Sequence, residues 1–111
     1  MGFGVLLLSA CGDGAPVIGC DLPRSWSDRT PYFDNRVKQR FPIGSDETKL
    51  LEELRKERFS ISDIHDPSRH FTFSALYEHS DLACRETWMI SWHADHGKVA
   101  NIQGNYRQVC L

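Results

Sequence analysis

Apolar and polar residues alternate with a period of two near the C-terminus of the chain, which is the pattern of half-buried β-strands. In residues 85–94, one face consists of Trp88, Ile90 and Trp92. In residues 98–109, one face consists of Ala100, Ile102, Gly104 and Tyr106. The turn residues Asp95-His96-Gly97 lie between the two stretches, so the pattern predicts a β-hairpin.

The pairing of these two strands depends on the length of the turn. A three-residue loop centred on His96 places Trp92 opposite Ala100 and Trp88 opposite Gly104, so that the two apolar faces coincide. A two-residue loop would place the apolar face of one strand beside the polar face of the other. We therefore expect the three-residue loop, with the ring of Trp88 covering Gly104.

An amphipathic helix is predicted over residues 45–57, before the strands. Ser45 is a suitable N-cap, and Leu50 and Leu54 lie on one apolar stripe. Between this helix and the hairpin, residues 71–77 are rich in strand-forming side chains. Together these elements predict an α+β fold in which an amphipathic helix packs on a three- or four-stranded antiparallel sheet.

The segment before the helix has a different composition. From residue 12 to residue 40, glycine, proline and serine recur too often for regular structure, although aromatic residues such as Trp26 lie among them. We expect the second half of this segment to lie against the domain. The chain therefore divides into an N-terminal targeting stretch over 1–10, a tether and wrapping segment over 11–40 and an α+β domain over 41–111.

Length and charge exclude several classes of protein. A chain of 111 residues has room for one small hydrophobic core. Its 13 Lys and Arg residues against 15 Asp and Glu residues leave a net charge of −2, which argues against a nucleic-acid-binding protein that relies on phosphate contacts. No apolar run reaches the roughly 18–20 residues that a membrane-spanning helix needs.

The first residues resemble the signal peptide of bacterial lipoproteins. Leu8-Ser9-Ala10-Cys11 follows an apolar run and is similar to a lipobox, in which the cysteine is acylated and becomes the new N-terminus. The apolar run is short and no basic residue precedes it, as expected if the signal peptide begins further upstream. The alternative is a buried strand over residues 5–8, with Cys11 an ordinary thiol.

The lipoprotein resemblance implies both an anchor and a location. Cys11 would carry palmitate-type acyl chains, in which each buried methylene contributes about 0.8 kcal/mol to membrane binding. The rest of the chain would then face the periplasm. By the same resemblance, Gly12 in place of an aspartate after the cysteine implies the outer membrane and not the inner membrane.

Three further cysteines are Cys20, Cys84 and Cys110. In the predicted hairpin Cys84 faces Gln108 and has Cys110 as its diagonal neighbour, so a small bulge or twist would bring the two cysteines within disulfide distance. Such a bond suits an oxidising envelope and would stabilise the domain by about 3.5 kcal/mol in the chain-entropy treatment. Cys20 is then left over and is a rival partner for Cys110. If Cys11 is not lipidated, Cys11–Cys20 is a rival pair.

Candidate residues for catalysis or metal binding are few. His93, Asp95 and His96 are the nearest approach to a zinc-binding cluster, although polar residues are expected at a hairpin turn in any case. The sequence has no Gly-x-Ser-x-Gly elbow and no phosphate-binding glycine loop. We therefore assign no catalytic residue, no metal and no cofactor. A metal-binding or hydrolytic envelope enzyme that uses His93, Asp95 and His96 remains the alternative.

The aromatic residues indicate a binding role more strongly. Trp and Tyr often anchor protein–protein interfaces, so the candidate contacts to a partner are Trp26, Trp88, Trp92 and Tyr106. The alternative is that the helix and the sheet bury these side chains in the core.

The order of helix and strands resembles that of small bacterial envelope lipoproteins. The likeness includes Phe-Pro-Ile-Gly-Ser at 41–45 and Leu-Leu-Glu-Glu-Leu at 50–54. In layout alone, the chain is also similar to outer-membrane assembly lipoproteins of the SmpA/OmlA type and to the domain of beta-lactamase inhibitory proteins. The resemblance implies a non-catalytic envelope lipoprotein that binds an envelope protein, as an assembly component or an immunity-type inhibitor.

Overall fold

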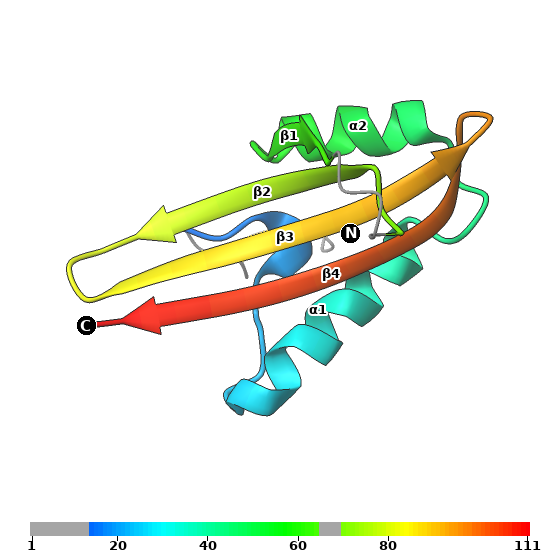
Figure 1. Ribbon diagram of the computed structural model, residues 1–111. Coiled ribbons are helices and arrows are strands. Elements are labelled where there is room, and N and C mark those ends of the chain that lie inside the picture. Colours follow the sequence, from blue (N-terminus) through cyan, green and yellow to red (C-terminus); the bar gives the residue numbers. More distant parts are fainter. Residues whose placement is uncertain (1–13, 65–69) are drawn as a thin grey trace, which may run out of the picture.

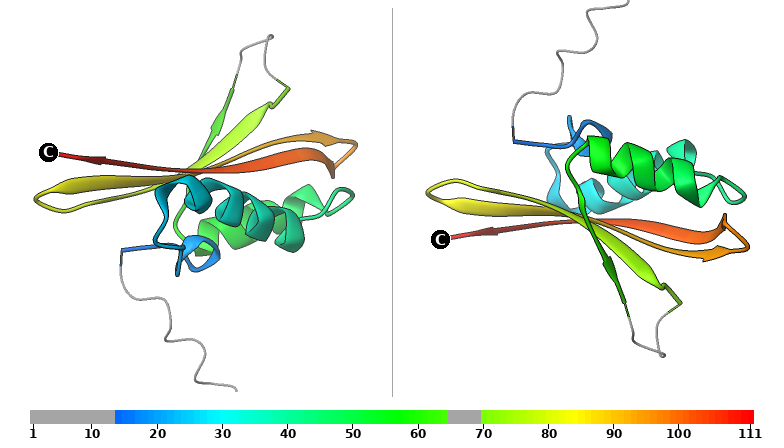
Figure 2. Two further views of the ribbon diagram at one scale, coloured as in Figure 1. Left: turned by 90° about the horizontal axis from the view of Figure 1, so that it is seen from below. Right: turned by 90° about the horizontal axis from the view of Figure 1, so that it is seen from above.

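In the part of the chain that the structure describes, four antiparallel strands form one sheet, and both helices lie on the same face of it (Figure 1; Figure 2). The computed structural model describes residues 14–64 and 70–111. The strand order is β1-β2-β3-β4, which confirms the predicted α+β class. The elements in chain order are η2 (Val17–Gly19), α1 (Trp26–Arg40), α2 (Glu47–Lys56), β1 (Ser60–Asp63), β2 (Phe73–Ser80), β3 (Cys84–Asp95) and β4 (Lys98–Cys110).

The core lies between the helices and one face of the sheet. Trp88, Ile90 and Trp92 of β3 point toward the helices, and none of them is more than 1% exposed. From α2, Leu50 and Leu54 are both fully buried. The predicted apolar face of the strand and the predicted apolar stripe of the helix are therefore confirmed.

Residues 26–40 form a helix, so the prediction of a loop-like tether was wrong for this segment. Phe33 and Val37, four residues apart on α1, are fully buried in the core. Pro31 lies inside the helix with its side chain exposed. Packing of the apolar stripe offsets the backbone hydrogen bond that Pro31 cannot make. The folded domain therefore begins well before residue 41.

α2 begins one residue later than predicted, and its N-cap is Asp46 in place of Ser45. Ser45 instead takes part in an isolated bridge to β4, in which Asp46 pairs with Lys98 and the carbonyl of Ser45 accepts a hydrogen bond from the N–H of Val99 at 2.8 Å. The N–H of Gly44 donates in turn to the carbonyl of Val99 at 2.8 Å. The helix begins only after this bridge, because the backbone of Gly44 and Ser45 is bonded to Val99 of β4.

The β3–β4 turn has two residues, so the predicted three-residue loop was wrong. Asp95 pairs with Lys98 across His96 and Gly97. Both turn residues have positive φ, 53° for His96 and 77° for Gly97, as a tight hairpin turn requires. The register then shifts by one residue after Ala94, at a β-bulge that follows the turn.

The bulge keeps the two apolar faces together despite the shorter turn. Trp88 lies opposite Tyr106, two residues further along β4 than predicted. A shift of two residues leaves every later side chain on its expected face. The bulge itself is the exception: the predicted inward residue Ala100 faces solvent, and Val99 is buried in its place with 1% exposure. The burial of the strands could therefore be predicted although their pairing could not.

Two glycines allow other segments to approach the sheet. Gly104 is covered by α1 and not by Trp88, since a Cβ there would lie 2.9 Å from Cγ2 of Val37. The ring of Trp88 covers Gly19 of η2 instead, and its Nε1–H donates to the carbonyl of Gly19 at 2.9 Å. Both glycines thus set the distance between the sheet and the layer above it.

Candidate protein-binding site

Three of the four aromatic residues predicted to contact a partner belong to the core. Trp88 and Trp92 are at most 1% exposed, and Tyr106 is 7% exposed. Their polar atoms are satisfied internally: Trp92 Nε1–H donates to Glu47 Oε2 at 2.9 Å, and the hydroxyl of Tyr106 donates to a carboxylate of β3. The prediction was wrong for these three, and the alternative, burial by helices and sheet, is correct. Trp26 differs, because it is 59% exposed.

The residues of the alternative metal site do not converge. His93 lies in β3 and its Nδ1 is 3.3 Å from Oγ1 of Thr72. Asp95 and His96 lie at the exposed β3–β4 turn, with His96 Nδ1 3.6 Å from Asp95 Oδ1. Within residues 14–64 and 70–111, no group of three His, Cys, Asp or Glu side chains is placed to hold a metal ion.

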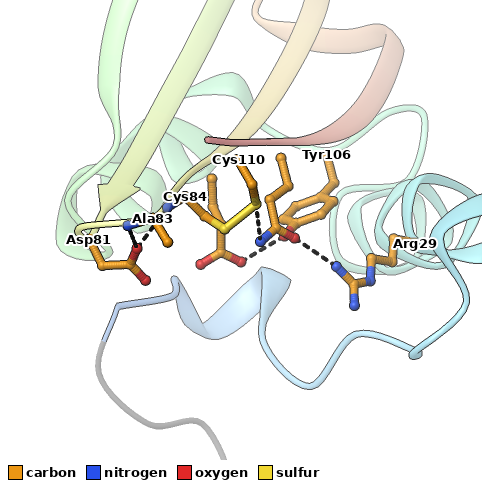
Figure 3. Close-up of a disulfide and its surroundings, with 8 residues drawn as sticks. Arg29, Asp81, Ala83, Cys84, Tyr106 and Cys110 are labelled. Atoms are coloured by element: carbon orange, nitrogen blue, oxygen red, sulfur yellow. Dashed lines mark hydrogen bonds between the residues drawn. A yellow bond between two sulfur atoms is a disulfide. The ribbon is translucent and has the colours of Figure 1, made fainter.

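A disulfide joins Cys84 to Cys110 at the end of the β3–β4 pair (Figure 3). The two cysteines are direct partners in the register, so the predicted pair is confirmed while the diagonal geometry was wrong. The two-residue turn and the bulge each shift the register by one residue, and together they move Cys110 from the diagonal position into line with Cys84. Cys20 is 3% exposed, and no described cysteine is a free thiol. Cys11 and the predicted signal peptide lie outside the described residues.

The turn before the disulfide is held by Asp81. Its Oδ1 accepts hydrogen bonds from the backbone N–H groups of Ala83 and Cys84, both at 2.8 Å. These two hydrogen bonds lower the pKa of Asp81 below its ordinary value, and the bond from Cys84 has the larger effect. The carboxylate thus orders the chain that leads into the disulfide, as Figure 3 shows.

On the helix side of this end, Trp26 is paired with Arg29 of the same helix. The guanidinium carbon of Arg29 lies 4.3 Å from the centroid of the Trp26 ring, within the range of a cation–π interaction. Two further groups hold the guanidinium: Nε donates to the carbonyl of Pro23 at 2.9 Å, and Nη1 donates to Oε1 of Gln108 at 3.0 Å. An exposed tryptophan is therefore fixed against an immobilised arginine.

Hydrogen bonds connect this pair to the disulfide. Gln108 Oε1 also lies 3.3 Å from the Tyr106 hydroxyl, which donates to Glu86 Oε2 at 2.6 Å. Burial and the bond to Glu86 raise the pKa of Tyr106 above its ordinary value. Gln108 Nε2 lies 3.5 Å from Cys110 Sγ. We call the surface formed by Trp26, Arg29, Gln108 and Cys110 the Trp26 patch.

The opposite face of the sheet has no helix on it among the described residues (Figure 2). Most of its side chains are polar. A shallow hollow of about 350 Å³ on this face is lined by His70, Phe71, Met89, Ser91, Gln103 and Asn105. Antiparallel sheets commonly leave one face to solvent, so this face does not by itself indicate a site.

Sequence reasoning singled out Trp26 as a candidate contact but did not include Arg29 or Gln108. The available signal was the spacing of Trp26 and Arg29, three residues apart, which brings two side chains together only on a helix. Because the composition of this segment predicts a loop, there was no reason to expect residues three apart to be neighbours. Gln108 joins the patch through tertiary packing and has no local signal.

The chain matches no protein-family model, no curated protein and no solved structure. The resemblance to envelope lipoproteins and to SmpA/OmlA-type proteins therefore stays a prediction. Among the described residues, no helix is long and apolar enough to cross a membrane. The arguments for function accordingly come from the sequence and the geometry of the Trp26 patch.

Proposed function

We propose that this chain is a non-catalytic, protein-binding module of the bacterial cell envelope, with the Trp26 patch as its contact surface. The observation that carries the proposal is the 4.3 Å pairing of the exposed Trp26 with Arg29. Trp and Arg are the side chains most enriched among residues that dominate binding energy at protein interfaces.

The support of Arg29 makes the patch suited to binding. An arginine on a free surface loses rotamer freedom when a partner binds, and that loss opposes association. Here the carbonyl of Pro23 and the side chain of Gln108 already hold the guanidinium. Less conformational entropy is left to lose, so contacts made by Trp26 and Arg29 would contribute more of their energy to affinity.

Two features support a location in the envelope. A disulfide such as Cys84–Cys110 persists in oxidising compartments and is rare in the bacterial cytoplasm. The lipobox-like residues 8–11 support a lipid anchor on Cys11. The proposed orientation places the domain in the periplasm, held to the outer membrane by its acyl chains.

Site-specific photo-crosslinking in the envelope tests the binding surface. A photoreactive aromatic amino acid, which keeps a ring at the position, replaces Trp26 in one variant and Tyr32 in the matched control, since Tyr32 is also an exposed aromatic on α1 with an arginine, Arg36, 5.7 Å above its ring. We expect one discrete protein adduct from position 26 and none from position 32. The same partner should be lost from pull-downs with Trp26→Ala and kept with Tyr32→Ala. Equal capture by both variants would reject the Trp26 patch.

Mass spectrometry of the membrane fraction tests the anchor. A diacylglyceryl adduct on Cys11 that disappears in Cys11→Ala supports it. A peptide in which Cys11 is bonded to Cys20 under non-reducing conditions supports the rival pair and contradicts lipidation. Metal analysis of the same preparation bears on the alternative enzyme, because a stoichiometric metal lost in His93→Ala would contradict a non-catalytic module.

A further inference from the structure

Other parts of the chain cover the outer edge of β4 near the β3–β4 turn and along its middle. Near the turn, the backbone of Val99 is bonded to the segment that precedes α2. In the middle, the N–H of Gly104 donates to Asp34 of α1, and the N–H and the carbonyl of Tyr106 both bond to Thr30 Oγ1. Another strand therefore cannot pair with β4 at these positions.

The last part of this edge is open. Backbone groups alternate in direction along a strand, so the outward direction seen at Tyr106 recurs at Gln108 and Cys110. The N–H of Leu111, on the β3 side, donates to the carbonyl of Ala83, as the same alternation requires. Among the residues that the structure describes, no group bonds to the outward backbone groups of Gln108 or Cys110. Figure 2 shows why, because the end of β4 runs past the start of α1.

The open edge adjoins the exposed tryptophan of the Trp26 patch. The side chain of Gln108 bonds to Arg29, whose guanidinium lies over the ring of Trp26. Neighbouring strands lie about 4.8 Å apart, so a strand added at Gln108 would pass beside this pair. The side chain opposite Gln108 would lie on the helix side of the sheet, close to the Trp26 ring. Backbone hydrogen bonds and an aromatic contact are thus available to the same ligand.

The other face of this end carries an arginine. Arg107 precedes Gln108 and points away from the helices, because side chains alternate between the faces of a strand. It is exposed, and within residues 14–64 and 70–111 no carboxylate forms an ion pair with it. A strand paired with Gln108 would place its neighbouring side chains near Arg107, where an acidic residue is favoured.

We propose that the partner binds by adding an extended segment to β4 at Gln108 and Cys110, with one side chain against Trp26 and an acidic side chain against Arg107. This proposal rests on the proposed function, because it specifies how the Trp26 patch binds. The spacing of outward N–H and carbonyl groups matches another extended backbone, and this identifies the occupant. A second copy of this chain fits less well, since two paired β4 strands would bring two Arg107 side chains together.

Photo-crosslinking in the envelope tests this mode of binding. One variant carries the photoreactive amino acid at Val109, whose side chain lies between Gln108 and Cys110 and points away from the helices. The matched control carries it at Asn105 on the same face, where α1 covers the edge. We expect position 109 to capture the protein that position 26 captures, and position 105 to capture none. Adducts from positions 26 and 109 should map to one short segment of that protein, because only a segment that follows the edge meets both faces.

Removal of one backbone donor provides a second test. Gln108→Pro deletes an N–H that points away from β3, so the pairing of β3 with β4 is kept. Gln108→Ala is the control, because it loses the same side-chain bond to Arg29 and keeps the N–H. At an equal thermal midpoint, we expect the proline variant to retain about five-fold less partner in pull-downs than the alanine variant. Arg107→Glu should lower capture and Arg107→Lys should keep it.

The outcomes separate this mode of binding from the Trp26 patch itself. Capture at position 26 without capture at position 109, or adducts on distant parts of the partner, overturns the strand addition and leaves the patch in place. Equal capture by the two Gln108 variants, or an adduct to a second copy of this chain at position 109, overturns it as well. If Gln108→Pro does not fold, the crosslinks decide. Absence of any adduct at position 26 overturns the proposed function and the strand addition with it.

Discussion

The carboxylate of Asp34 on α1 accepts a hydrogen bond from the backbone N–H of Gly104 on β4, with Oδ1 2.8 Å from the nitrogen. One turn earlier on the helix, Thr30 makes a similar pair of contacts: its Oγ1 donates to the carbonyl of Tyr106 at 2.9 Å and lies 3.2 Å from the amide nitrogen of the same residue. Side chains of α1 thus take the place of a neighbouring strand along the middle of β4. An open edge that would otherwise pair with another chain is covered.

Removal of the Asp34 carboxylate should destabilise the fold. Asp34→Ala leaves the N–H of Gly104 without its acceptor beneath the helix, so we expect the free energy of unfolding to fall by about 1–3 kcal/mol. Asp34 also forms an ion pair with Lys38 at 2.6 Å, and Lys38→Ala is the control for it. That exposed pair should contribute less than about 0.5 kcal/mol. Urea unfolding that gives equal losses for both variants would contradict the role of the edge contact.

Gly19→Ala should be costly for a steric reason. The added Cβ would lie 2.3 Å from Cδ1 of Trp88, so the buried indole or the backbone at residue 19 would have to shift within a packed core. We expect a loss of about 1–3 kcal/mol together with a changed near-ultraviolet circular dichroism signal from the indole. Gly44→Ala is the contrast, because that position has φ of 95° and open space around it. It should lower stability through the backbone alone and leave the indole signal unchanged.

The Cys84–Cys110 bond should contribute about 3.5 kcal/mol through the unfolded state, given its sequence separation of 26 residues. The double variant Cys84→Ser, Cys110→Ser tests this pair without a reductant, which would also act on Cys20. Urea unfolding at neutral pH compares the free energy of unfolding of the double variant with that of the parent, and we expect the variant to be less stable by about that amount. A stability equal to that of the parent would show that the bond does not restrict the unfolded chain.

Stability should fall on the acid side of pH 4. The pKa of Asp81 is lowered in the folded state, so its carboxylate contributes stability that is complete above the unfolded pKa of about 3.8 and is lost as the pH falls through the lower folded value. The hydrogen bond from Lys98 lowers the pKa of Asp46 in the same direction. The free energy of unfolding should depend less steeply on pH in Asp81→Asn than in the parent. It should depend still less steeply in the variant that also carries Asp46→Asn.

An opposite dependence is expected at alkaline pH. Burial, together with the hydrogen bond to Glu86, raises the pKa of Tyr106, so the neutral phenol contributes stability that is complete below the unfolded pKa of about 10 and is lost as the pH rises above it. Ultraviolet absorbance should show one tyrosine that ionises only as the protein unfolds. Tyr106→Phe should lack that phase, and a phenolate that titrates before unfolding would contradict the assignment.

The site was less predictable than the core. The alternation of apolar residues along β3 was enough to place Trp88 and Trp92 on one face, because side chains alternate between faces in any strand. Whether that face meets solvent or a helix is not a local property, so the same two residues were also candidates for a binding surface. Only the packing of α1 and α2 over the sheet resolves this, and it leaves Trp26 as the exposed member of the set.

Local periodicity in the sequence was enough to predict two sets of features: the amphipathic stripe of α2 and the inward faces of β3 and β4. Tertiary structure decided the rest. The strand register depends on a two-residue turn and a bulge, each of which shifts the pairing by one residue. Because a shift of two residues returns every side chain to the same face of the sheet, the alternation of apolar residues does not reveal it. α1 is a helix in spite of Pro31 because Phe33, Val37 and Asp34 pack on or bond to β4. The stabilisation comes from tertiary contacts, so it cannot be predicted from the local sequence of the segment.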